Sequence, residues 1–420
     1  MEMKKIHILW GGAAVALLLA SCQGGKMSGN VNDGDTLPMK YAQLLTIVKH
    51  SDAYSEVMIG NPWKKGTALH RYILVPKGKE GDETVAKLAE QPTGSGAGGA
   101  IDTVRTPVEN SVVFTSPHCQ LMYELGAKDA IRGVCDLGYI NIPDIKKRAA
   151  AKAECADVSS KDEQRQAIVD CGSSMAPDIE RIIALKPQAL LISPFENSGG
   201  YGKLDKLHIP IVETADYMET SPLGRAEWMK FYGVLFGSDG SDSLFSAIEK
   251  EYLSLKAQAA ELPKGLSILT ERKMGNVWYV PGGQSTIGVL LKDANARYIF
   301  EDDTHSGSLA MSPEQILAKG KKVDVWAFKY FEPQPLTRPQ LLQEYKGYGA
   351  LLAFNTKDIY ECSTSNQPYF ELTSFHPEIL LREFIILAHQ DSFFGKLRFY
   401  KRLDAPDDLP LWGKTEECKG

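Results

Sequence analysis

Five residues with metal-binding side chains are the first candidates for chemistry in this sequence. They are His118, Asp302, Asp303, His305 and His376. A transition-metal site needs ligands that converge at fixed distances, and this set has no recognisable local spacing. The sequence also contains no G-x-S-x-G nucleophile elbow, no H-E-x-x-H zinc-protease motif and no phosphate-binding loop. We therefore expect no bare metal site, no catalytic residues and no resident cofactor, so the protein should not be an enzyme.

A cysteine near the start of the chain offers a different chemistry, the attachment of lipid to a thiol. Cys22 ends the run Leu19-Ala20-Ser21-Cys22, which follows a basic start and a short apolar stretch. This run resembles the lipobox of a bacterial lipoprotein. The apolar stretch is too short for a mature membrane span and is typical of a secretory signal over residues 1–22. The Gly/Ser/Asn/Asp-rich tract 23–37 indicates a flexible tether rather than a partner that could pack a buried helix. We expect lipidated Cys22 to anchor the protein to a membrane of the cell envelope, facing the periplasm.

The remaining cysteines are even in number, which permits disulfides in an oxidising compartment. They are Cys119, Cys135, Cys155, Cys171, Cys362 and Cys418. The sequence does not choose a pairing, and buried free thiols explain them equally well.

Length and charge limit the kinds of partner. With 420 residues, the chain is long enough for two or three domains with a ligand cleft between lobes. The formal net charge of -6 and a pI near 5.8 provide no basic field for nucleic acid. We expect no nucleic-acid partner.

Residues 38–107 precede the main repeating pattern and predict a small β/α extension. A helical stretch is expected near 39–49, followed by β-rich runs at 56–59 and 69–75 that form a hairpin. The run 94–99 matches G-x-G-x-x-G, but no strand precedes it and no helix clearly follows it. We interpret it as a linker, not a dinucleotide loop.

From residue 108 onward, apolar runs alternate with helical periodicity, which is typical of a mostly parallel α/β sheet. Strands are expected at 111–115, 131–134, 189–192, 211–212, 266–269, 277–280, 323–328 and 350–354. Helices are expected at 119–125, 179–185, 222–236, 242–262, 288–300, 313–318 and 377–388. The pattern predicts two Rossmann-like α/β lobes, at 108–220 and 264–403, joined by a long rigid helix within 221–263. A tail would follow at 404–420. One continuous doubly wound sheet is the alternative, which the long helix disfavours.

Four short strings carry a resemblance to a known family. They are 125–134 and 177–187 in the first lobe, and 311–317 and 375–381 in the second. In this order and at these distances, the sequence from about 112 to 403 resembles the class III, helical-backbone periplasmic substrate-binding proteins. Those proteins serve ABC importers of cobalamin, ferric siderophores or haem. The resemblance implies a monomer that holds a metal chelate between its lobes and hands it to a permease dimer with its ATPase.

The resemblance also implies that one glutamate on each lobe docks on the permease. Glu180 and Glu314 occupy those motif positions. Each could instead complement the dipole of its own helix, and Ser312 with Gln315 would make an ordinary capping box. Their matched placement in both lobes favours docking, because paired charges orient a protein on its target.

A cleft for a flat or apolar chelate should be rich in aromatic side chains with a few polar anchors. Candidates on loops after the predicted strands are His118, Tyr139, Phe195, Tyr201, Trp278, Tyr279, Tyr330, Phe331, Tyr369 and Phe370. Core or loop packing explains any single one of them better than ligand contact does, so the group predicts a pocket better than any member does.

Departures from the family pattern rank the ligands. In the loop before the helix of Glu180, haem binders of this family often carry an iron-ligating tyrosine, but residues 171–176 of this chain contain no tyrosine. Before the glutamate motif of the second lobe, the cobalamin binder has a tryptophan, but residues 307–309 of this chain are Gly-Ser-Leu. Ferric siderophore binders tend to use Arg, Lys and Tyr, and Arg272, Lys273, Lys329 and Tyr330 are available. We therefore expect an iron chelate, with a corrinoid as the alternative. Haem, a bare metal ion and a non-transport envelope lipoprotein rank lower.

Overall fold

The structure is a computed structural model that describes residues 34–50, 54–78, 81–85, 100–154, 167–196 and 200–404. The expected signal over 1–22, Cys22 and the glycine-rich run 94–99 lie outside these residues. Within the described ranges, every helix is too short or too polar to cross a membrane.

The N-terminal extension contains a five-stranded sheet in the order β1-β2-β3-β4-β5. Its strands are β1 (Asp35–Thr36), β2 (Leu45–His50), β3 (Tyr54–Gly60), β4 (Ala68–Pro76) and β5 (Ala100–Thr106). The two expected β-runs are confirmed as β3 and β4. The helix expected near 39–49 is wrong, because Leu45 and Ile47 alternate into the core as part of β2, which pairs antiparallel with β3.

The first lobe is built on a parallel sheet in the order β12-β11-β6-β7-β8. Its strands are β6 (Ser111–Val113), β7 (Ile131–Val134), β8 (Val169–Asp170), β11 (Ala189–Ile192) and β12 (Ile211–Glu213), and β9 (Gly172–Ser173) pairs with β10 (Ala176–Pro177). Its helices are α2 (Ser116–Glu124), α3 (Pro143–Glu154) and α5 (Ile179–Leu185), with 3₁₀ turns η1 (Lys128–Ala130), η2 (Leu137–Tyr139), η3 (Leu204–Leu207) and η4 (Ala215–Met218). Parallel strands bring their carboxyl ends to one edge, where the following loops gather.

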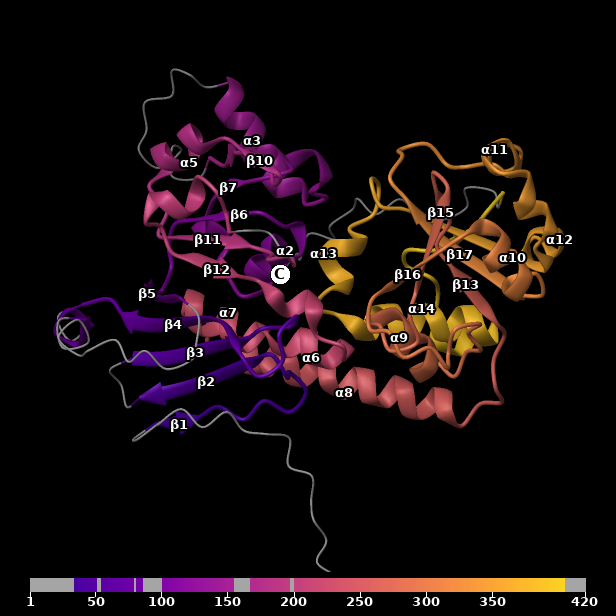
Figure 1. The fold of residues 1–420 in the computed structure, drawn as a ribbon, viewed down its shortest axis with the longest axis horizontal. Helices are drawn as coiled ribbons and strands as arrows, with labels where there is room; N and C mark the ends of the chain where they lie inside the picture. The colour runs from indigo at the N-terminus through magenta and orange to yellow at the C-terminus, as the bar shows by residue number, and fades with distance from the viewer. Residues whose placement is uncertain are drawn as a thin grey trace, which may run out of the picture. The chain divides into compact units, whose positions relative to one another are not determined.

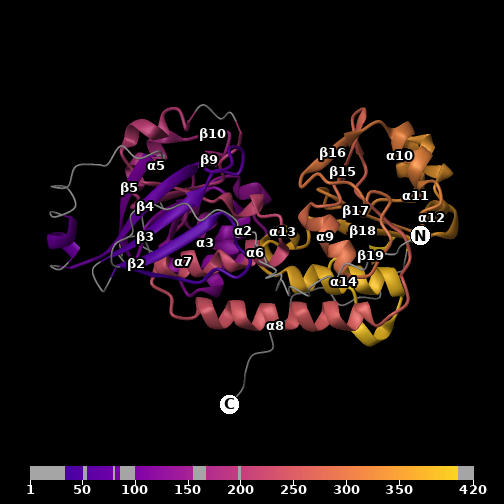
Figure 2. The same cartoon turned by 60° about the horizontal axis from the view of Figure 1, so that its bottom comes forward.

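Three helices connect the two lobes. The helix expected over 222–236 is divided at Trp228 into α6 (Pro222–Glu227) and α7 (Met229–Phe236). The long helix is α8 (Ser241–Ala260), which lies beside α7 and α14 (Pro377–His389) in Figures 1 and 2. Its buried stripe recurs every three or four residues and consists of Phe245, Ile248, Tyr252, Leu255 and Ala259.

The second lobe contains the sheet β13-β17-β18-β19, parallel except for its last strand. Its strands are β13 (Ile268–Thr270), β17 (Val325–Tyr330), β18 (Ile359–Ser363) and β19 (Lys401–Arg402), with a separate antiparallel sheet of β14 (Lys273–Met274), β15 (Val277–Pro281) and β16 (Ser308–Met311). Its other helices are α9 (Thr286–Asp293), α10 (Pro313–Gly320), α11 (Arg338–Glu344), α12 (Leu352–Thr356) and α13 (Tyr369–Thr373), with η5 (Lys346–Ala350) and η6 (Ser392–Phe394). The strand expected at 350–354 is wrong. That stretch ends in α12, which stops at the left-handed Lys357, and the strand is β18 just beyond it.

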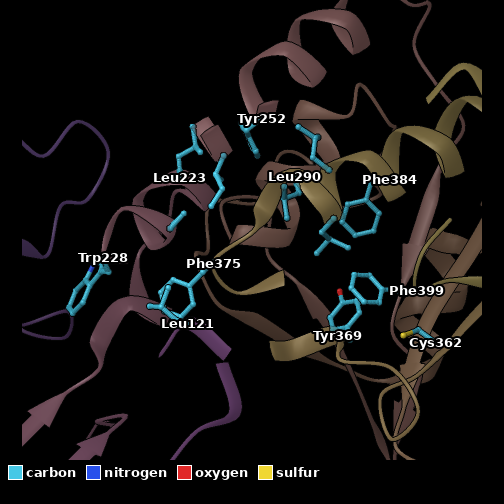
Figure 3. Close-up of a cluster of buried hydrophobic side chains, with 14 of the residues drawn as sticks. Leu121, Leu223, Trp228, Tyr252, Leu290, Cys362, Tyr369, Phe375, Phe384 and Phe399 are labelled. Carbon is cyan, nitrogen blue, oxygen red and sulfur yellow. The ribbon is translucent and has the colours of Figure 1, made fainter. Parts of the chain in front are cut away.

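One hydrophobic cluster runs through both lobes and the connecting helices, and it includes residues of the N-terminal sheet. Figure 3 shows part of it, from Leu121 through Trp228 and Tyr252 to Phe384 and Phe399. The two lobes and the connecting helices therefore share one hydrophobic core. The exact domain boundaries expected from the sequence remain predictions.

Two buried glutamates fix the extension to the connecting helices. The Glu227 carboxylate accepts hydrogen bonds from the backbone N–H groups of Lys40, Tyr41 and Ala42 at 2.8–3.0 Å. Glu219 accepts from the N–H groups of Gln43 and Leu44 and from the indole of Trp228. Carboxylates that satisfy so many orphan donors hold this segment in one place.

Candidate ligand-binding site

A cavity of about 490 Å³ lies at the carboxyl ends of the parallel strands of both lobes. Loops after β6, β7 and β11 form one wall, and loops after β17 and β18, with α13, form the other. Its volume falls in the range of about 300–1,000 Å³ that is usual for small-molecule sites. The walls combine aromatic rings with a small set of polar groups.

Four of the expected ligand-facing residues line this cavity: His118, Tyr139, Phe331 and Phe370. The rings of Tyr139 and Phe331 come from opposite lobes, and their centroids are 4.6 Å apart. Both remain accessible, at 62% and 47%. This aromatic pair is well placed to cover an apolar face of a ligand.

The other six candidates do not line it. Trp278, Tyr330 and Tyr369 are buried in the core, at 0%, 5% and 3% exposure. Tyr201 donates its hydroxyl to Glu213 at 2.9 Å, and Phe195 and Tyr279 are exposed outside the cavity. Trp278 on β15 and Tyr330 on β17 lie in the core because alternate side chains of a buried strand enter the core whatever their aromatic character.

The basic side chains expected to bind a siderophore contact other groups of the protein, outside the cavity. Arg272 forms ion pairs with Glu344 and Glu332, and Lys329 forms one with Glu271. Lys273 donates to the carbonyl of Gly275 at 2.7 Å. None of the three lines the cavity.

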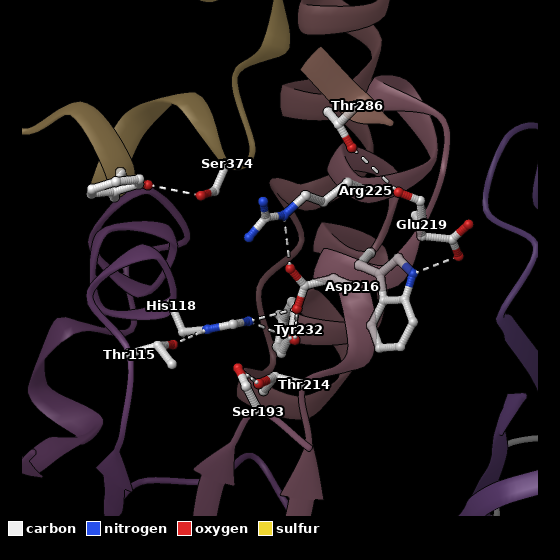
Figure 4. Close-up of polar contacts among 12 residues, drawn as sticks. Thr115, His118, Ser193, Thr214, Asp216, Glu219, Arg225, Tyr232, Thr286 and Ser374 are labelled. Atoms are coloured by element: carbon white, nitrogen blue, oxygen red, sulfur yellow. Dashed lines mark hydrogen bonds and ion pairs between the residues drawn. The ribbon is translucent and has the colours of Figure 1, made fainter. Parts of the chain in front are cut away.

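The cation that does line it is Arg225 on α6, which sequence reasoning missed. Its Nε donates to Asp216 Oδ2 at 3.1 Å, and Asp216 Oδ1 lies 2.8 Å from Nε2 of His118 and accepts from the Tyr232 hydroxyl at 3.2 Å (Figure 4). Burial would raise the pKa of Asp216, but the charges and hydrogen bonds of His118 and Arg225 outweigh it and lower that pKa. Asp216 is therefore an ionised, fully buried anchor for both partners.

His118 presents a ring without a free nitrogen. Nδ1 contacts Thr115 Oγ1, and Nε2 faces Asp216 and Tyr232. Both nitrogens are engaged, so the side chain is suited to positioning and packing and not to ligating a metal.

The residues considered for a bare metal ion are not brought together. Among the residues that the structure describes, no group of three or more His, Cys, Asp or Glu side chains is arranged to hold a metal. His305 instead pairs with Asp303, and His376 pairs with Glu124 and Glu378.

Four cysteines fall within the described residues, and all are buried and outside disulfides: Cys119, Cys135, Cys171 and Cys362. Burial raises the pKa of Cys119 and Cys135, and it raises that of Cys362 to about 12. These thiols act as small core side chains.

Each expected docking glutamate lies in the first turn of an exposed helix end. Glu180 is in α5, which Asp178 caps, and Glu314 is in α10, which has the expected capping box of Ser312 and Gln315. Both carboxylates are exposed. Because other side chains cap each helix, the two glutamates are available to another molecule; docking remains a proposal.

The lobes are joined beside the cavity by polar contacts. The N–H of Asn141 in the first lobe donates to Glu371 of α13 at 2.8 Å. His376, before α14, lies 2.9 Å from both Glu124 of α2 and Glu378. Burial would lower the pKa of His376, but these two carboxylates outweigh it and raise the pKa to about 10.

The His376 contact predicts a pH dependence of stability. A histidine whose pKa is higher in the folded state stabilises it fully below its unfolded pKa of about 6.5 and loses that contribution as pH rises toward 10. We expect unfolding in urea at pH 7 and pH 9.5 to show a loss of about 2–3 kcal/mol that His376→Gln removes. His305→Gln, at an exposed pair, should keep the wild-type difference. An identical pH difference in His376→Gln would contradict the assignment.

Two α/β lobes around a cavity at their strand ends define a ligand-binding protein of the two-lobed type. The family comparison agrees: residues 140–365 match the periplasmic binding protein family, and the chain belongs to it. Members of this family bind solutes and are not enzymes. An uncharacterized lipoprotein of Methanocaldococcus jannaschii is 22% identical over 369 residues, covering 85% of this chain and 83% of the relative. A second such lipoprotein from the same organism is 23% identical over 245 residues, covering 56% and 62%.

Solved structures support the same fold. A periplasmic binding protein from Veillonella parvula superposes with a TM-score of 0.51 at 13% identity, covering 68% of this chain and 92% of that one. The protein is thus a periplasmic-type solute-binding protein, and the two relatives reported above are lipoproteins.

Proposed function

We propose that this protein captures an iron chelate of the ferric siderophore type in the cavity between its lobes and delivers it to an ABC permease. The observation that carries the proposal is the cavity itself, whose Tyr139–Phe331 pair spans the two lobes. Aromatic walls suit the organic shell of a chelate. Both ring nitrogens of His118 already contact other protein groups, so His118 is not free to ligate a bare metal ion. This favours a metal ion that is already held by a chelator.

In this proposal, lipid on Cys22 keeps the protein at an envelope membrane near its importer. Glu180 and Glu314 would engage basic residues on the two halves of the permease dimer. The protein would act as a monomer, and the ATPase of the importer would supply the work.

Tryptophan-fluorescence titration of the chain beginning after Cys22 tests the ligand assignment. The panel contains ferric trihydroxamate and catecholate chelates, cobalamin, haemin and free divalent metals, with correction for ligand absorbance. Submicromolar saturation by a ferric chelate is expected. Saturation by cobalamin or haemin alone would replace the ferric siderophore as the assigned ligand. A folded sample whose fluorescence changes with none of the compounds would contradict the proposal.

A pair of variants ties the binding to the cavity. Tyr139→Ala with Phe331→Ala should weaken chelate binding by roughly tenfold or more, since two exposed rings lose their contacts with the ligand. Tyr279→Ala, which removes an exposed ring outside the cavity, should leave the affinity unchanged. Equal affinities in all three proteins would place the ligand elsewhere.

A further inference from the structure

Arg225 is held rigidly, although the cavity walls give its outer nitrogens nothing to bind. Its side chain is 21% exposed, while the Asp216 carboxylate that holds Nε is fully buried. The guanidinium carbon lies 6.0 Å from the centre of the Phe375 ring, which restricts the plane of the group from a second side. In Figure 4 the two terminal nitrogens point away from Asp216, on the side of Ser374.

The support behind Arg225 extends over three further elements. Asp216 lies on η4, His118 on α2 and Tyr232 on α7, and the hydrogen bonds among them are 2.8–3.2 Å long. A guanidinium fixed through Nε by a buried carboxylate loses little conformational freedom when it binds a ligand.

Three hydroxyl groups of the cavity wall already have hydrogen-bond partners within the protein. Ser374 donates to the carbonyl of Phe370 at 2.8 Å, and Thr364 donates to that of Tyr330 at 3.0 Å. Ser193 is hydrogen-bonded to Thr214 at 2.9 Å. Among the described residues, no hydrogen bond or ion pair uses the terminal nitrogens of Arg225, so they are the strongest donors left for a ligand.

The cavity wall also contains the carboxylate of Asp136, on the loop after β7. Among the described residues, this carboxylate forms no ion pair. Arg225 is paired with Asp216 and not with Asp136. Asp136 therefore leaves the outer edge of the guanidinium open, and it could itself accept from an N–H group of the same ligand.

We propose that Arg225 is the anchor for an anionic oxygen group, a carboxylate of the bound chelate, so that the site selects acidic chelates over neutral ones. This inference rests on the proposed function and adds the charge class of the ligand to it. A planar guanidinium whose two terminal nitrogens are free presents one edge that matches a carboxylate in a two-bond arrangement.

The test compares matched ligands. One is a ferric trihydroxamate with a free carboxylate on its periphery, and the other is the same chelate with that carboxylate converted to an amide. A corrinoid with one peripheral carboxylate and its amide form make a second pair. The wild-type chain from residue 23 should prefer the acidic member of the pair it binds by roughly tenfold to a hundredfold.

Arg225→Gln should abolish that preference while leaving the amide form bound as before, which also shows that the variant is folded. Arg272→Gln removes a cation outside the cavity and should keep the preference. If loss of Arg225 leaves Asp216 unpaired and unfolds the protein, Asp216→Asn with Arg225→Gln removes both charges and serves the same comparison.

The outcomes separate the two proposals. Binding of the acidic and amide forms with equal affinity by the wild type, or a preference that survives in Arg225→Gln, would overturn the role of Arg225 and leave the transport function standing. Failure of all four compounds to bind would overturn the proposed function together with the inference.

Discussion

Replacing both Glu180 and Glu314 by alanine is expected to abolish ligand uptake in cells while changing ligand affinity by less than about twofold. Both carboxylates are exposed in the first turns of α5 and α10, and neither lines the cavity. Charges at the rim of an interface guide and orient encounter more than they hold a bound ligand. Uptake of radioactive iron chelate and fluorescence titration of the purified variant measure the two quantities separately.

The matched control for this variant is a second pair of exposed glutamates. Glu109 and Glu301 lie one in each lobe and have side chains that are 70% and 51% exposed. Alanine at both positions should leave uptake intact. Uptake that persists in the Glu180/Glu314 variant, or affinity that falls with it, would contradict the docking assignment.

The second large effect is expected at Glu227. Alanine there leaves three backbone N–H groups of residues 40–42 without their acceptor and removes the nearer of the two carboxylates that pair with Lys230. Removing one side of a buried charged network costs about 3–5 kcal/mol, so the free energy of unfolding should fall by that amount. Urea denaturation followed by circular dichroism measures it.

Two further variants test whether the loss of stability comes from the buried carboxylate of Glu227. Glu227→Gln keeps one acceptor oxygen and should lose less stability than the alanine variant. Glu251→Ala on α8 removes a half-exposed ion pair with Arg382 and should cost about 1 kcal/mol or less. A Glu227→Ala protein as stable as Glu251→Ala would show that the extension does not depend on this carboxylate.

Most of the α/β core could be predicted because its strands are short apolar runs between turn residues. The strand at 189–192, Ala-Leu-Leu-Ile, is such a run, and it is confirmed as β11. The N-terminal error has an equally physical origin. Met39, Ala42, Leu45 and Val48 recur every third residue, which is typical of a helix, but pairing of β2 with β3 decides the structure. The periodicity of one segment of sequence does not show which other segment it pairs with.

The site was predictable only in part for the same reason. Tyr139 and Phe331 follow recognisable strands, so their place at the strand ends could be expected. Arg225 could not be identified, because its importance comes from Asp216, and the burial of that carboxylate depends on His118 and Tyr232 from two other helices. An Asp and an Arg nine residues apart carry no signal by themselves.

The hydroxyl of Tyr72 bears on whether the first lobe can be prepared without the N-terminal sheet. On β4 of the extension, it donates to the carbonyl of Ile211 and accepts from the N–H of Glu213, so it occupies the open hydrogen-bonding edge of β12, the outer strand of the first lobe. An uncovered edge strand is a template for self-association. Removing residues 34–106 would bare this edge and take away the backbone N–H groups of residues 40–44 that donate to Glu219 and Glu227, so we expect the shortened protein to aggregate.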